Sequence, residues 1–309
     1  MKILLINGSL RGDYSSSLKV AHAFVKGMVE EYGADTEVCE VALKDKRIDH
    51  CHGCFVCWKT TPGQCCIHDD MDELRQMVMD SDIIVESFPL YFFGLPSKLK
   101  AFTDRMISYV QEYRGNPGDE ENHRFLHNMR YPELEKKKLI LVSTCGYEVT
   151  DNCYDAVFAE FDRICGEGKY TTVLAPQGGP LSEQGFAEKV ARYLEKFKEA
   201  GHEYAREGCL SERTWNKLQR PLLGHSTFEM AINMNWDNPE VGVERGDTKE
   251  ICSEACLCDR EWRNPYPVPA QGNVGRQKGN ERCVEKRQLC CLFQSHKSCG
   301  WVLYDTTVW

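Results

Sequence analysis

Five cysteines lie in one short segment of the sequence, and their spacing suits metal or redox chemistry. The segment reads Cys51-x2-Cys54-x2-Cys57-x7-Cys65, with Cys66 next in the chain. Four thiolates can bind a [4Fe–4S] cluster, and the two x2 intervals would let three of them cap one face of it. Zinc is an alternative, and so is a loop without metal whose thiols are structural or redox-active. The spacing leaves open whether Cys65 or Cys66 would be the fourth ligand.

A second segment is suited to binding an anion. The apolar run of residues 2–7 leads into Gly8, then into Arg11 and three consecutive serines, and a helical pattern follows. Backbone N–H groups at a helix N-terminus bind anions, and hydroxyl and guanidinium donors fit phosphate oxygens. The segment has neither the Gly-Lys-Ser/Thr ending of a P-loop nor the Gly-x-Gly-x-x-Gly fingerprint. Phosphate binding and ordinary helix capping both account for this composition.

A third segment could border a flat ligand. Three aromatic residues and a glycine stand between Pro89 and Pro96, directly after an apolar run. Such a loop is stiff, exposes ring edges and brings backbone amides close to a ligand such as an isoalloxazine ring. The alternative is a hydrophobic plug between helices.

Alternating elements must position these segments. Strands are predicted at 2–7, 36–43, 82–88, 138–144 and 170–174, and helices at 15–31, 69–80, 97–112, 154–165 and 183–206. This alternation predicts a doubly wound, five-stranded parallel sheet with helices on both faces and ligands at the carboxyl ends of the strands. The division expected is an α/β domain over 1–206, a helical extension over 207–250 with one or two helices in 211–235, and a poorly ordered Cys-rich tail over 251–309. The cysteine spacings of the tail match no tight ligand pattern.

Composition excludes several classes of protein. The 309 residues carry a net charge of −9, which disfavours binding to nucleic acid or to an anionic membrane. No run approaches the roughly 18 apolar residues of a membrane-spanning helix, and the apolar start is too short for a signal peptide. The chain contains 17 cysteines. Without an export signal, such thiols are expected to stay reduced in a cytoplasmic protein.

The Gly-Ser-x-Arg loop at 8–11 and the Pro-Leu-Tyr-Phe-Phe-Gly-Leu-Pro-x-x-Leu-Lys-x-Phe-x-Asp-Arg segment at 89–105 resemble the NAD(P)H-dependent FMN reductase family. The similarity is greatest to the branch that includes iron–sulfur flavoproteins, and it covers about residues 1–200. It implies a flavodoxin-like fold. The residues expected at the FMN phosphate are Ser9, Arg11, Ser15, Ser16 and Ser17. Those expected around the ring are Pro89, Leu90, Tyr91, Phe92, Phe93 and Gly94, with Thr144, Cys145, Gly146 and Tyr147 on its other side.

The resemblance implies an FMN-dependent NAD(P)H oxidoreductase. Hydride would pass from the nicotinamide to flavin N5, and electrons would continue to a quinone, a nitro or azo compound, another flavin, or a protein. The flavin carries the chemistry, so we expect no dedicated catalytic acid or base. Tyr91 or Tyr147 would contact the acceptor, and the preference between NADH and NADPH stays open. The resemblance also implies a homodimer or higher oligomer.

Two alternatives belong to other classes of protein. One is an electron carrier with FMN and a [4Fe–4S] cluster on Cys51, Cys54, Cys57 and Cys65. The other is a binding module in which the Cys-rich tail holds a metal and the flavin fold is only a scaffold.

Overall fold

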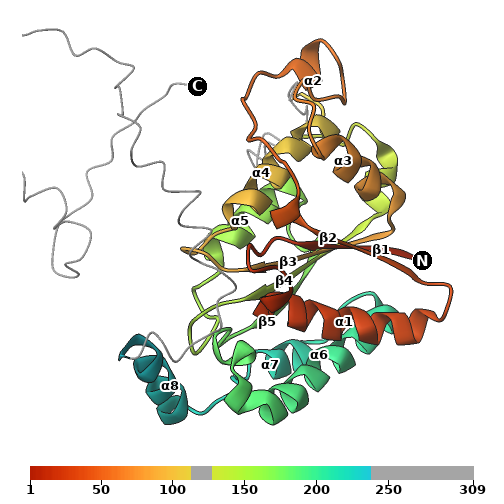
Figure 1. The fold of residues 1–309 in the computed structure, drawn as a ribbon. Helices are drawn as coiled ribbons and strands as arrows, with labels where there is room; N and C mark the ends of the chain where they lie inside the picture. Colours follow the sequence, from red (N-terminus) through yellow and green to blue (C-terminus); the bar gives the residue numbers. More distant parts are fainter. Residues whose placement is uncertain (113–126, 238–309) are drawn as a thin grey trace, which may run out of the picture. The chain divides into compact units, whose positions relative to one another are not determined.

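The computed structural model describes residues 1–112 and 127–237, and a single five-stranded sheet organises them (Figure 1). The strands are β1 (Lys2–Asn7), β2 (Glu37–Ala42), β3 (Ile83–Pro89), β4 (Lys138–Thr144) and β5 (Tyr170–Ala175). All neighbouring strands are parallel, and their order is β2-β1-β3-β4-β5. This order is that of the flavodoxin-like fold. The predicted fold class is therefore confirmed.

The helices are α1 (Ser16–Tyr32), α2 (Val56–Lys59), α3 (Met71–Asp80), α4 (Ser97–Arg105), α5 (Asp155–Ile164), α6 (Ala187–Glu207), α7 (Glu212–Leu218) and α8 (His225–Asp237). Short 3-10 turns are η1 (Gly12–Tyr14), η2 (Leu43–Asp45), η3 (Met106–Tyr109), η4 (Pro132–Lys136), η5 (Pro180–Ser182) and η6 (Gln184–Phe186). No helix in the described ranges is both long and apolar enough to cross a membrane.

One predicted helix ends early. The pattern predicts a helix over 97–112, but α4 stops at Arg105 and the chain continues as η3. Carbonyl groups that would extend the helix bind side chains from elsewhere. The indole N–H of Trp58 donates to the carbonyl of Ile107 at 2.9 Å, and Arg130 Nε donates to that of Ser108 at 3.3 Å. Such partners are distant in the sequence, so local periodicity does not reveal them.

The two faces of the sheet are both covered. Alternate residues of β1 enter separate cores, with Ile3 and Leu5 on one face and Leu4 and Ile6 on the other. Helices α1 and α6 cover the first face, and α3, α4 and α5 cover the second (Figure 1). This is why the strand is a continuous apolar run. Leu218, at the end of α7, joins the first core, and the Cys-rich tail 251–309 lies outside the described residues.

Helices α1 and α6 cross with their backbones in contact. A Cβ atom on Gly27 would meet the carbonyl oxygen of Lys198, and one on Gly201 would meet that of Phe24. Only glycine, which has no Cβ, allows α1 and α6 to approach so closely on this face of the sheet (Figure 1).

Candidate functional site

The loop after β1 is built on the side chain of Asn7. Its Oδ1 accepts the N–H of Ser9 at 3.0 Å, and Ser9 Oγ in turn accepts the N–H of Arg11 at 3.2 Å. Gly12 then takes a left-handed φ of 55°, and the chain reverses into α1. The loop is thus fixed by its own hydrogen bonds. Arg11 is exposed, whereas Ser9 is buried.

The three serines at the start of α1 are all buried, and their hydroxyls have different partners. Ser15 caps the helix, because its Oγ accepts the N–H of Leu18 at 3.3 Å, and it lies 3.1 Å from Ser17 Oγ. Ser16 Oγ is 2.8 Å from Ser182 Oγ, in the segment after β5. The first N–H groups of any α-helix lack intrahelical partners. Hydroxyl and N–H donors therefore gather at this terminus, as an anion site requires.

The aromatic segment after β3 forms a tight turn. Tyr91 and Gly94 exchange two backbone hydrogen bonds of 3.0 and 2.9 Å. Between them, Phe92 and Phe93 have positive φ angles of 47° and 64°. This left-handed conformation is costly for bulky residues, and strained positions of this kind cluster at functional sites. The side chain of Phe92 is 99% exposed, so the turn presents a ring directly to solvent.

The loop after β4 faces this turn. The rings of Phe93 and Tyr147 are stacked, with centroids 5.7 Å apart and planes 16° apart. Leu90 N–H donates to the carbonyl of Thr144 at 2.8 Å, which joins the two loops at their bases. The side chain of Cys145 is buried. Burial raises the pKa of this thiol to about 11, so it is protonated at neutral pH.

The loop after β4 is supported from behind by Gln177, which the sequence analysis missed. Its backbone N–H donates to the carbonyl of Tyr147 at 2.8 Å. Its side-chain amide exchanges hydrogen bonds of 2.9 and 2.7 Å with the backbone of Leu223. The segment after α7 therefore holds the third loop in place. Asn7 and Ser182 were also missed, although an Asn directly before Gly-Ser at a strand end is a turn signal.

These three loops fit the parts of an FMN molecule. Strands β1, β3 and β4 are neighbours in a parallel sheet, so their loops lie at one edge. Ser87 aligns with Asn7 in the β1–β3 pairing, and its buried Oγ has no partner within the described residues. A Cβ on Gly146 would meet no other atom, which leaves space beside Tyr147. A donor-rich helix terminus, an orphaned hydroxyl and an aromatic wall suit a phosphate and a flat ring.

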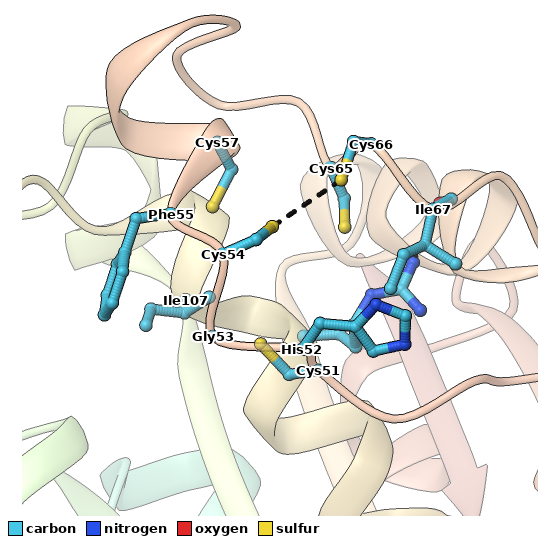
Figure 2. Close-up of a pocket in the computed structure, with 11 residues that line it drawn as sticks. Cys51, His52, Gly53, Cys54, Phe55, Cys57, Cys65, Cys66, Ile67 and Ile107 are labelled. Carbon is cyan, nitrogen blue, oxygen red and sulfur yellow. Dashed lines mark hydrogen bonds between the residues drawn. The ribbon is translucent and has the colours of Figure 1, made fainter.

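The cysteine segment forms a separate pocket beside α4 (Figure 2). The sulfurs of Cys51, Cys54, Cys57 and Cys65 turn toward a common space in Figure 2. That space is small, about 20 Å³, and Cys54 Sγ lies 3.6 Å from Cys66 Sγ at its border. The donor set suits a cluster, but some side-chain rotation is needed to admit one.

The thiols of this pocket influence one another. Burial raises the pKa of Cys57, and the nearby Cys65, Cys51 and Cys54 add to this effect. The backbone N–H of Val56 lowers the pKa of Cys54. Across residues 1–112 and 127–237, no three His, Cys, Asp or Glu side chains gather closely enough for a single metal ion.

A buried arginine, also missed by the sequence analysis, completes the pocket. Arg105 is 1% exposed and lies against the cysteines. Both oxygens of Asp69 accept from its guanidinium, at 2.8 and 3.0 Å. The carbonyls of Asp49 and Ile67 each accept at 2.9 Å. The sequence signal for this arginine was the Asp-Arg pair at positions 104–105, which ends the segment 89–105.

The geometry defines a flavodoxin-like fold with a donor-rich loop and an aromatic turn at one edge of the sheet. Residues 1–148 match the NADPH-dependent FMN reductase family, so the resemblance carried by the motifs is confirmed over that range.

Curated relatives agree with this match. An iron–sulfur flavoprotein from Archaeoglobus fulgidus is 36% identical over 109 residues, which are 35% of this chain and 47% of the relative. One from Methanocaldococcus jannaschii is 35% identical over 105 residues, 34% of this chain and 51% of the relative. An FMN-dependent NADH:quinone oxidoreductase from Pseudomonas syringae is 27% identical over 152 residues, 47% of this chain and 70% of the relative. The chain thus spans about half the length of the first two relatives.

Among solved structures, an FMN-dependent NADH-azoreductase from Bacillus anthracis covers 66% of this chain and 100% of its own. It is 18% identical, with a TM-score of 0.47. The fold assignment rests on the strand order and not on this likeness.

Proposed function

We propose that this chain is an FMN-dependent NAD(P)H oxidoreductase. The observation that carries the proposal is the meeting of three loops, 8–17, 89–94 and 144–147, at one edge of the sheet. When bound, FMN would supply the hydride and electron chemistry, and the protein would supply binding and orientation. The family match over residues 1–148 supports this proposal, because that range contains all three loops.

The residues of the chain would then have distinct roles. Ser9, Ser15 and Ser17, with the first N–H groups of α1, would bind the phosphate. Arg11 is exposed, so it would add charge from the solvent side. Ser16 is also expected at the phosphate. It would have a second role, because its hydrogen bond with Ser182 ties the helix terminus to the segment after β5.

The ring would lie against the turn after β3. Within the described residues, the backbone N–H groups of Phe92 and Phe93 have no backbone partner, so they are available to the polar edge of a ring. Tyr91 and Tyr147 are 42% and 49% exposed. Both would contact the electron acceptor, for which we propose a quinone or an azo compound.

The test is turnover by the full chain loaded with FMN. NADH or NADPH oxidation should depend on added FMN and on a quinone or azo acceptor, and Tyr147→Ala should slow it. Val38→Ala, an exposed change on the edge strand β2, is the matched control and should leave the rate unchanged. An FMN-loaded protein that oxidises neither nucleotide would contradict the proposal.

A second candidate function is an electron carrier that also binds a [4Fe–4S] cluster. The observation that favours it is the orientation of four cysteine sulfurs toward one space (Figure 2). The cluster would add one-electron chemistry, and Cys51, Cys54, Cys57 and Cys65 would bind it. Anaerobic reconstitution with iron and sulfide should give about four irons per chain. Serine at any of these positions should abolish this, whereas Cys39→Ser, on exposed β2, should not.

Other expectations stay predictions. These are the homodimer, the cytoplasmic location and the domain boundaries at 206 and 250. Size-exclusion chromatography with light scattering tests the homodimer directly.

A further inference from the structure

We propose that Arg105 is a positioning residue of the cysteine pocket, whose Nε–H donates to the sulfur of Cys65 when a cluster is bound there. This contact makes Cys65, and not Cys66, the fourth ligand, and it raises the reduction potential of the cluster bound there. The inference rests on the second candidate function, the [4Fe–4S] site.

The hydrogen bonds of Arg105 leave one donor unused. An arginine has five N–H donors in a fixed planar fork. The four on its terminal nitrogens match the four hydrogen bonds to Asp69, Asp49 and Ile67. Nε is buried and has no partner within the described residues. A buried donor without a partner is costly, so a nearby acceptor is expected to complete it.

The acceptor that we assign to this donor is the sulfur of Cys65. Arg105 and Cys65 line the same pocket, and the two side chains interact. Cys65 is half-buried, whereas Cys66 is exposed and its sulfur contacts Cys54. The two adjacent cysteines therefore have different surroundings. Both cysteines line the pocket, but Cys65 is the one that interacts with Arg105, whose position is fixed by Asp69.

A hydrogen bond to a ligating sulfur has a known electrical consequence. It withdraws electron density from the thiolate and so favours the reduced, more negative state of a cluster. The carboxylate of Asp69 is fully buried and offsets much of the arginine's charge. The effect on the potential is therefore expected to come mainly from the Nε–H bond.

Ligand choice is tested in the full chain, reconstituted anaerobically with iron and sulfide. Cys66→Ser should keep the iron content of the wild type, and Cys65→Ser should lose it. The opposite result, or equal retention by both variants, would overturn the assignment. A wild-type chain that takes up no iron would overturn the cluster itself, which is a separate failure.

The role of Arg105 is tested by redox titration followed by electron paramagnetic resonance. Arg105→Lys keeps the charge beside Asp69 but removes the Nε–H, so the potential should become more negative. Arg75→Lys is the matched control. Arg75 is partly buried and its Nε also lacks a partner within the described residues, but its guanidinium donates to Gly63 and Ser108 and it does not line the cysteine pocket. The cluster of the Arg75→Lys variant should have the same reduction potential as that of the wild type.

If Arg105→Lys fails to fold, the pair Arg105→Met/Asp69→Leu removes both buried charges together, which proteins tolerate better than an unpaired charge. It should show the same negative shift. If the Arg105 variants fold but lose iron, and the wild type and Arg75→Lys keep it, that result also supports the positioning role. An unchanged potential at full iron content would overturn it.

Discussion

The rings of Phe93 and Tyr147 lie almost parallel, with centroids 5.7 Å apart, and they join the loop after β3 to the loop after β4. We expect a flat ligand at this edge of the sheet to stack on this pair or to replace one of its rings, so that aromatic contact contributes to the binding energy.

Tyr147→Ala should therefore weaken FMN binding. An aromatic pair contributes about 0.5–1.5 kcal/mol, so the dissociation constant should rise about 2- to 10-fold. Titration of flavin fluorescence measures this change. Val149→Ala, in the same loop and also 49% exposed, should bind FMN as the wild type does. Equal losses in both variants would show that the loop, and not the ring, was disturbed.

Ser17→Ala should reduce the preference for FMN over riboflavin, which lacks the phosphate. Its hydroxyl lies 3.1 Å from that of Ser15 at the start of α1. A lost hydrogen bond to a charged group costs about 1.5–3 kcal/mol, so FMN binding should weaken roughly 10- to 100-fold. Riboflavin binding should not change. Ser97→Ala, an exposed serine at the start of α4, is the control. Parallel losses for both ligands would place the phosphate elsewhere.

The stability of the protein should depend on the ionisation of Glu86. Burial, with Glu160 nearby, raises the pKa of this carboxyl from 4.5 to about 8. Between these values the folded chain keeps a proton that the unfolded chain has lost. Stability from this group therefore falls as pH rises through that window, by at most about 1.4 kcal/mol per pH unit.

Glu86→Gln removes this dependence. The free energy of unfolding of each protein is measured by urea denaturation. The value for Glu86→Gln minus the value for the wild type should increase from pH 5 to pH 8. Glu37→Gln, an exposed change, should follow the wild type at each pH. Parallel curves for Glu86→Gln and the wild type would contradict the raised pKa.

Gly201→Ala should destabilise the fold, because the new methyl group would meet the carbonyl oxygen of Phe24 in α1. Overpacking of this kind costs about 1–3 kcal/mol. Gly185→Ala adds a methyl group that meets no other atom, so thermal denaturation should separate the two variants. A Tm for Gly201→Ala at or above that of the wild type would contradict the close crossing of α1 and α6.

Much of the fold was predictable because its signals are local. A strand buried on both faces must be apolar throughout, and residues 2–7 show this in the sequence itself. The alternation of such runs with helical patterns then predicted the parallel sheet. The loops after β1, β3 and β4 were predictable for the same reason, since each follows directly from a recognisable strand.

The rest depends on contacts between distant residues. Gln177 acts through Leu223, and Arg105 acts through Asp69 and the cysteine pocket, so neither pattern is visible locally. The positive φ angles of Phe92 and Phe93 were also hidden, because glycine or asparagine usually signals such a turn. Here the only glycine, Gly94, stands after the two left-handed positions.

The most direct test of the central claim is an absorbance spectrum of anaerobically purified protein, with FMN and iron quantified per chain. The account predicts flavin bands at about one FMN per chain, at the latest after reconstitution with FMN. About four irons with a broad shoulder beside those bands would add the second candidate function. A protein that binds no flavin even after reconstitution would contradict the account.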